Sequence, residues 1–237
     1  MTRRLEAWLE ALRVYRHPRV LAMLFLGFSA GLPFPMVFST LSAWLRDFGV
    51  ERATIGFFAW IGITYSVKVL WAPIVDRLGL PALTRLLGQR RSWMLLAQCG
   101  VAVGLFMLSR LDPALQIGSV VVFALAVAFS SATQDITIDA WRIESVEQSR
   151  QGAMAAAYNF GYRFAVLAGG AGALYLADFY DWHVAYAVMA GLMLVGIVTT
   201  LAVAEPERRS DPITAEMEGE IARYLSAHAG LWAPLRR

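Results

Sequence analysis

The sequence predicts an all-α membrane protein, in which six transmembrane helices form one bundle and both termini lie in the cytoplasm. Of the 237 residues, 58% are hydrophobic and 16% are charged, whereas about 25% of the residues in a soluble domain are charged. Six apolar segments are each close to the length of about 20 residues that a helix needs to cross a hydrocarbon core. Arginines gather between these segments on alternate sides, which is the pattern of a multi-pass protein.

The rare reactive residues exclude several classes of protein. Cys99 is the only cysteine, so neither an intramolecular disulfide nor a cysteine-based metal site can form. The three histidines are dispersed, and no phosphate loop, zinc motif, nucleophile elbow or dinucleotide fingerprint is present. The net charge of +3 comes from arginines between apolar segments rather than from a nucleic-acid-binding patch. We therefore expect no cofactor, no metal and no nucleic acid, and a soluble enzyme is excluded.

The chain opens with residues 1–19, in which apolar side chains recur at helical spacing among arginines. This pattern predicts an interfacial helix on the cytoplasmic face. The first span follows at residues 20–45 and, without a cleavage site behind it, would act as an uncleaved targeting signal. Pro33 and Pro35 interrupt this span beside Gly31. We expect a kink there; the alternative is a broken helix whose backbone groups face a substrate.

The second and third spans are expected at 53–75 and 92–108, the third being the shortest. Acidic and basic residues stand at the two ends of the connection between them, and a carboxylate there can pair with an arginine across it. We expect these residues to form a cytoplasmic gate; the alternative is ordinary positive-inside charge. The proposed gate residues are Asp76, Arg77, Arg90 and Arg91.

The last three spans are expected at 115–140, 152–177 and 184–203, followed by a cytoplasmic amphipathic tail over 204–237. The fifth span is rich in glycine, including Gly161, which is typical of close helix packing. Trp71 and Trp141 lie near helix ends and are interpreted as anchors at the membrane interface.

The arginines between the spans predict the orientation. Sixteen arginines lie in the N-terminal lead, the second and fourth connections and the tail, against three in the other connections. Because cytoplasmic segments carry the excess of basic residues, both termini are expected in the cytoplasm.

Lys68, Asp135 and Arg163 lie inside otherwise apolar spans. A charge at membrane depth costs about 2.5–3.5 kcal/mol on insertion scales, so such residues usually face a protein interior or a wet cavity. At about 1.5 Å per residue, all three lie roughly 10–17 Å from the cytoplasmic boundary. Asp135 can neutralise either cation, and the remaining positive charge suits an anionic substrate. The alternatives are an ion pair that only holds helices together, and a Lys68 side chain that extends to water at the interface.

Asp139 follows Asp135 by four residues, so both carboxylates lie on one helical face. A buried carboxylate beside a cation can couple proton movement to transport, so these two residues are the proton-coupling candidates. For Asp139, a role in a gate or a side chain that extends to water at the interface is at least an equal alternative. The candidates for substrate contact are polar residues in the same region. They are Lys68, Arg163, Tyr162, Asn159, Gln134 and Tyr65.

Three segments resemble the AmpG-type muropeptide permeases of the major facilitator superfamily. They are residues 70–77, 134–142 and 161–163, which read LWAPIVDR, QDITIDAWR and GYR. The resemblance covers nearly the whole chain. It implies a proton-driven importer of anhydro-muropeptides in the bacterial inner membrane, in which Asp135 and Asp139 match the acidic motif. Muropeptides carry carboxylates, which agrees with a site that holds Lys68 and Arg163.

Facilitators of this kind have about twelve helices in two bundles, and this chain supplies one bundle. The resemblance therefore implies an amino-terminal half that works with a separate carboxy-terminal half or with a second copy. The alternatives are a truncated or non-transporting membrane scaffold, and a transporter of another carboxylated solute such as an acetyl-CoA-type substrate.

Overall fold

The computed structural model describes residues 14–206, and every regular element in this range is helical. Most of the expected interfacial helix over 1–19 and of the expected tail over 204–237 lies outside the described residues. A single 3-10 turn, η1 (Val14–Arg16), precedes the first long helix.

The first expected span is one helical run with two breaks, built from α2 (Pro18–Gly31), α3 (Pro33–Val37) and α4 (Ser39–Asp47). The breaks fall at Leu32 and Phe38. Pro33 and Pro35 have no N–H to donate to the preceding turn, which accounts for the break at Leu32, whereas at Phe38 the backbone leaves the helical conformation, with a φ of −118° and a ψ of −93°. The run from Pro18 to Asp47 is still long and apolar enough to cross a membrane as one piece. The expected kink is therefore confirmed.

The second expected span alternates between α-helical and 3-10 turns. It consists of α5 (Arg52–Phe57), η2 (Phe58–Ile61), α6 (Gly62–Ser66), η3 (Val67–Leu70) and α7 (Ala72–Arg77). The connection to the next span contains one further short helix, α8 (Leu83–Leu87).

Two long helices follow, α9 (Gln89–Leu108) and α10 (Ile117–Ser145), and each extends a few residues beyond the expected span at the end where its arginines lie. The next helical run contains α11 (Gln148–Leu167), a π-helical turn η4 (Ala168–Gly172) and α12 (Ala173–Phe179). The last run consists of α13 (Trp182–Leu192) and α14 (Leu194–Ala202).

Five of these runs are long and apolar enough to span a membrane, namely Pro18–Asp47, Arg52–Leu70, Gln89–Leu108, Ile117–Ser145 and Trp182–Ala202. The fifth expected span, 152–177, lies in the continuous run of α11, η4 and α12, which is not among the five. Polar residues such as Asn159 and Arg163 and the many glycines lower the mean hydropathy of this run. The structure therefore supports a multi-span helical bundle, whereas length and composition alone count five spans.

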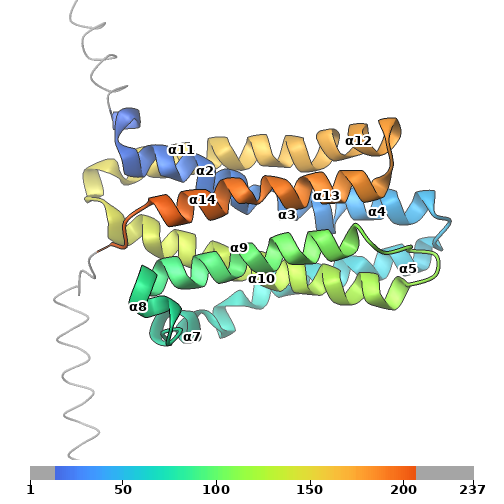
Figure 1. The fold of residues 1–237 in the computed structure, drawn as a ribbon, viewed down its shortest axis with the longest axis horizontal. Helices are drawn as coiled ribbons and strands as arrows, with labels where there is room; N and C mark the ends of the chain where they lie inside the picture. Colours follow the sequence, from blue (N-terminus) through green and yellow to red (C-terminus); the bar gives the residue numbers. More distant parts are fainter. Residues whose placement is uncertain (1–13, 207–237) are drawn as a thin grey trace, which may run out of the picture. The chain divides into compact units, whose positions relative to one another are not determined.

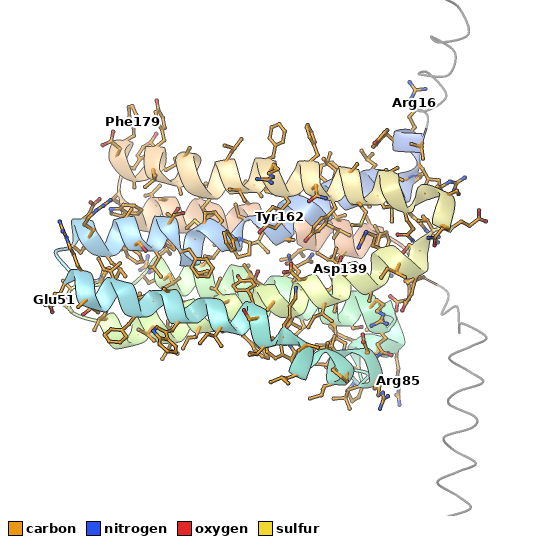
Figure 2. All side chains as sticks on the ribbon, turned by 180° about the vertical axis from the view of Figure 1, so that it is seen from behind. Arg16, Glu51, Arg85, Asp139, Tyr162 and Phe179 are labelled. Carbon is orange, nitrogen blue, oxygen red and sulfur yellow. The ribbon has the colours of Figure 1, made fainter. Side chains whose placement is uncertain are left out.

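The connections divide the bundle into two ends. The arginines at one end, which we call the arginine-rich end, are Arg16, Arg19, Arg77, Arg85, Arg90, Arg91, Arg142 and Arg150, and those at the opposite end are Arg46, Arg52 and Arg110. Figure 2 shows Arg16 and Arg85 at the arginine-rich end, and Glu51 and Phe179 at the opposite end. The asymmetry that the sequence predicted is therefore present in the folded bundle.

Two close helix pairs organise the bundle: α11 packs along α2, and α10 packs along α9 (Figure 1). At the first contact, a Cβ atom on Gly27 or Gly31 would collide with backbone oxygens of α11, and one on Gly161 with a backbone oxygen of α2. Glycine on both helices lets the two backbones approach closely. The interpretation of Gly161 as a packing residue is confirmed.

Aromatic residues fill the core at both ends. Near the opposite end Trp44 stacks on Trp182, whose Nε1 donates to Asp47 at 3.1 Å. Near the arginine-rich end Trp141 is completely buried and its Nε1 donates to the carbonyl oxygen of Ala204 at 3.1 Å. The interpretation of Trp141 as an interfacial anchor is therefore wrong, because its indole joins α10 to the end of the last span instead of facing lipid headgroups.

Candidate functional site

An ion pair joins two of the three charged residues that the sequence places at membrane depth. Lys68 on η3 donates from Nζ to Oδ2 of Asp135 on α10 at 3.4 Å. The side chains are 34% and 19% exposed, so the pair is sheltered but still open on one side. The sequence predicts that Asp135 can pair with either Lys68 or Arg163, and in the structure it pairs with Lys68.

The second carboxylate oxygen of Asp135, Oδ1, is buried without a hydrogen-bond partner among the described residues. Next to it on α10, buried Gln134 accepts a hydrogen bond from the hydroxyl of Ser29 at 3.1 Å. Thr133, which precedes Gln134, accepts at its hydroxyl from Nε1 of Trp71 at 3.2 Å, and the Trp71 ring packs on Phe129. The carboxylate that holds Lys68 therefore keeps one acceptor atom available.

Tyr65, from the same span as Lys68, is half-buried and packs its ring near Phe34 and Phe38 of the kinked first span. The structure thus places it between the second span and the kink. Tyr65 and Asp135 also interact electrostatically.

Arg163 on α11 is exposed and forms no ion pair with any of the described residues. Its neighbour Tyr162 is half-buried, stacks near Tyr158 at a centroid distance of 6.1 Å and interacts electrostatically with both Asp135 and Arg163. Asn159 is exposed and donates only to the carbonyl oxygen of Ala155, one turn back on its own helix. These groups therefore line an open face rather than a closed pocket.

Figure 2 shows Tyr162 and Asp139 on the same face of the bundle. Asp139 is 54% exposed and pairs with Arg142 at 3.2 Å, one turn further along α10. It therefore forms a local surface pair and takes no part in the Lys68–Asp135 contact. The two carboxylates share a helix face, as the spacing predicted, but their environments differ.

The expected gate residues meet only in part. Arg90 at the start of α9 pairs with Asp76 at the end of α7 at 2.5 Å, and with Glu144 at the end of α10 at 2.6 Å. Its side chain is only 11% exposed. Arg77 is exposed. A single buried arginine thus ties three helices together at the arginine-rich end.

Arg91 contacts a different helix, α14. Its guanidinium donates to the carbonyl oxygens of Thr200 at 2.9 Å and Leu201 at 2.8 Å, at the C-terminal end of α14. In the other direction, Glu205 accepts from the backbone N–H groups of Arg90 at 2.7 Å and Arg91 at 3.1 Å. A cation at a helix C-terminus and a carboxylate at a helix N-terminus each stabilise the local dipole. The start of α9 and the end of α14 are therefore joined reciprocally.

Gly88 makes this joint possible, because it has a φ of +88° and a Cβ atom at this position would collide with the Glu205 side chain. Left-handed backbone of this kind favours glycine. Glu144 and Glu205 were both absent from the residues expected at the gate. Both are acidic residues at the ends of predicted spans, and the distribution of arginines places those ends on the same side of the membrane as Arg90. This is the sequence signal from which they could have been predicted.

The electrostatics of the open face follow from the residues above. Lys68 and Arg163 supply two cations and Asp135 one partly buried anion, which leaves positive charge for an anionic ligand. Among residues 14–206, no group of three or more histidine, cysteine or acidic side chains is placed to hold a metal ion. A face with more cations than anions attracts anionic groups.

The apolar grooves of the bundle lie elsewhere. Three adjoining grooves, of about 380, 440 and 350 Å³, run between α2 and its neighbours α11 and α14. Side chains such as Phe25, Leu24 and Phe160 line them, and no residue expected at the site is among their lining residues. They have the character of a lipid-facing surface.

Comparison with known proteins identifies relatives that match most of the chain. The profile of the Major Facilitator Superfamily matches residues 23–237. The anhydromuropeptide permease of Escherichia coli (strain K12) is 38% identical over 198 residues, which are 83% of this chain and 40% of the permease.

Two further relatives come from rickettsiae. The putative transporter AmpG 4 of Rickettsia felis is 35% identical over 197 residues, which are 82% of this chain and 47% of that protein. The putative transporter AmpG 3 of Rickettsia typhi is 27% identical over 213 residues, which are 90% of this chain and 51% of that protein. The chain thus spans about half the length of these relatives, or less.

Proposed function

The chain belongs to the Major Facilitator Superfamily, and on this premise we propose that it is the amino-terminal half of a proton-coupled importer of anhydro-muropeptides in the bacterial inner membrane. The resemblance seen in the sequence is confirmed by the relatives, which are named permeases and transporters. The chain is accordingly a multi-pass membrane protein and not an enzyme. The observation that carries the proposal is the Lys68–Asp135 ion pair, together with Arg163, which forms no ion pair with any residue in 14–206.

Six spans with both termini in the cytoplasm are part of the proposal. The fifth of these spans would be the run of α11, η4 and α12, which is continuously helical from Gln148 to Phe179. Close glycine packing on α2 and sheltering of Arg163 by a second half would offset its lower hydropathy. The arginine-rich end would then face the cytoplasm. The proposed domains are an interfacial helix over 1–19, the bundle over 20–203 and a cytoplasmic tail over 204–237.

The substrate site would lie on the open face between this half and a second one, whether separately encoded or a second copy. There Lys68 and Arg163 would bind substrate carboxylates. The polar residues that would surround the substrate are Tyr162, Asn159, Gln134 and Tyr65. Facilitators place their sites between two bundles that rock against each other. Charge is the support for a carboxylated ligand, because the face carries more cations than anions.

Proton coupling would use the ion pair itself. Lys68 cannot hold a substrate carboxylate and Asp135 equally well, since both anions compete for the same ammonium group. Protonation of Asp135 would release Lys68 to the substrate, and departure of the substrate would restore the pair and expel the proton. Asp139, paired with Arg142 on the surface, would serve as a stepping point toward the cytoplasm or as part of the gate.

The gate would be the arginine-rich end, where Asp76, Arg90 and Glu144 form one ion-pair network. Arg77 and Arg91 flank it in sequence, and Arg91 contacts the end of α14. Opening would require movement of α7 relative to α9 and α10, because Asp76 is the more exposed partner of Arg90. The network connects the site face to the end at which the substrate would leave.

The test is uptake of radiolabelled anhydro-muropeptide by cells that lack their own permease. The chain is expressed alone and together with the part of the E. coli permease that it does not match. We expect uptake with both parts, at least a tenfold loss for Asp135→Asn and Lys68→Gln, and abolition by a protonophore. Asp112→Asn is the matched control, because Asp112 lies in a connection at the opposite end and its carboxylate accepts, among the described residues, only from the backbone N–H of Ala114.

Two outcomes would contradict the proposal. If no combination gives uptake and Asp135→Asn lowers only the thermal stability of the purified chain, the charges hold helices together and the chain is a scaffold. If uptake is blocked by other carboxylated solutes, such as an acetyl-CoA-type compound, and not by muropeptides, the substrate class is wrong.

A further inference from the structure

Four polar side chains from four different helices lie in the interior of the bundle, away from the open face. They are Ser29 on α2, Gln98 on α9, Gln134 on α10 and Thr200 on α14, and each is completely buried. A buried polar atom is costly unless it is hydrogen-bonded, and the bilayer core offers no solvent as a substitute. It therefore matters which polar atoms of these four side chains have a hydrogen-bond partner.

The hydroxyl groups in the cluster are satisfied and the amide nitrogens are not. Thr200 donates to Oε1 of Gln98 at 2.9 Å, and Ser29 donates to Oε1 of Gln134 at 3.1 Å. Nε2 of Gln98 and Nε2 of Gln134 are both buried and have no partner among the described residues. Exchanging the assigned O and N atoms of an amide does not give every N–H group a partner. The two amides together have four N–H groups, which would then have only the two hydroxyl oxygens of the cluster to donate to.

Gly196 on α14 brings the two hydrogen-bonded pairs together. A Cβ atom at residue 196 would lie within 3.0 Å of both the Ser29 Oγ and the Gln98 Nε2. These two atoms therefore flank the same small region beside the α14 backbone, yet no direct hydrogen bond joins them. Two hydrogen bonds of about 2.8 Å through one water molecule span about 5 Å between the outer atoms.

We propose that Ser29, Gln98 and Gln134 form a buried water-binding site beside Gly196. The water molecule accepts from the Gln98 amide, donates to the Ser29 oxygen and has the Gln134 amide as its third partner. Buried water molecules in proteins typically make about three such hydrogen bonds to groups that are otherwise unsatisfied. The ligand is thus water itself, held by two glutamines and a serine in the core of a membrane bundle.

The site has a structural consequence for the ion pair. Gln134 precedes Asp135 on α10, so the bound water ties the turn that carries this carboxylate to α2 and α9. The cluster also reaches the arginine-rich end, because the carbonyl oxygen of Thr200 accepts from the Arg91 guanidinium at 2.9 Å. Polar groups therefore connect that end to the depth of Asp135 through the bundle interior, and the water site does not depend on which solute the chain carries.

The test is solid-state NMR on the full chain, uniformly labelled with ¹³C and ¹⁵N, in lipid bilayers. Magnetisation is transferred from water protons to nitrogen, and signals are assigned through sequential correlations, so no substitution is needed. We expect the Nε2 signals of Gln98 and Gln134 to receive this magnetisation. The backbone amide of Val101, buried on the same helix and bonded within it, is the control and should receive none.

Two variants sharpen the result. Ser29→Ala removes one partner of the water and should reduce the transfer to Gln98 at least twofold. Thr199→Val should leave the transfer unchanged, because among residues 14–206 the Thr199 hydroxyl bonds only to Val195 on its own helix. The proposal is overturned if Gln98 receives no more magnetisation than Val101, or if its amide protons correlate directly with the Ser29 hydroxyl. Water density within 3.2 Å of both atoms in a high-resolution map would be the independent confirmation.

Discussion

Replacing Arg90 by methionine tests the network at the arginine-rich end most directly. The methionine keeps much of the apolar length of the side chain but removes the guanidinium that contacts Glu144 through three hydrogen bonds and Asp76 through one. Glu144 is only 19% exposed, so the change leaves a partly buried carboxylate without its cation. The effect is therefore a loss of stability rather than a neutral surface change.

The magnitude follows from burial. Removing one partner of a buried pair costs about 3–5 kcal/mol, whereas an exposed pair is worth about 0–1 kcal/mol. Arg90 and Glu144 are near the first case, and Asp76, at 46% exposed, is nearer the second. We expect a loss of about 3 kcal/mol in the free energy of unfolding, which is about 6–12 °C in Tm for a chain of this size.

The assay is thermal unfolding of the purified chain in detergent, with two further variants. Arg85→Met is the matched control, because Arg85 lies on α8 at the same end, is exposed and forms no ion pair among the described residues. Adding Glu144→Gln to Arg90→Met removes the orphaned charge and should recover about half of the loss. An Arg90→Met Tm within 2 °C of that of Arg85→Met would refute the reasoning.

Three other substitutions are measured by the same unfolding assay. Thr200→Val should cost about 1–2 kcal/mol, because it removes a buried bond to another helix; Thr199→Val should stay within about 0.5 kcal/mol, and equal losses would argue against the interhelical bond. Gly161→Ala should cost about 2 kcal/mol or more, since its Cβ atom would enter the backbone of α2, whereas Gly118→Ala meets open space and should be neutral or stabilising. Glu205→Gln should cost about 1 kcal/mol through the weaker charge at the start of α9, and the loss should shrink in high salt if it is electrostatic.

The features of this fold that can be predicted from the sequence are mainly those that depend on the free-energy cost of placing a charge in the hydrocarbon core. Lys68 and Asp135 have few options at membrane depth, so their pairing follows from their depth and opposite sign. The separation of arginines between the two ends follows for the same reason. Gly161 is predictable because only close packing explains glycine in a span that also carries Arg163.

Other features depend on which helices are neighbours, which hydropathy does not reveal. Trp141 stands near a helix end like an interfacial anchor, but the end of the last span covers it. Glu144 and Glu205 become partners of Arg90 only because α10 and α14 end beside the start of α9. Over residues 152–177, hydropathy does not detect a span, although the run is continuously helical. Small and polar residues lower its mean hydropathy.

The π-helical turn η4 gives the chain a place where its length can change. A π turn holds about one residue more than an α turn, so loss of one residue between Ala168 and Gly172 would leave the helices on both sides in phase. A deletion elsewhere in α11 would rotate every following side chain by about 100° around the helix axis, so these side chains would lose their contacts with α2. Gly170, which faces open space, is the residue whose removal we expect the bundle to accommodate, so natural length variation among relatives should concentrate at this turn.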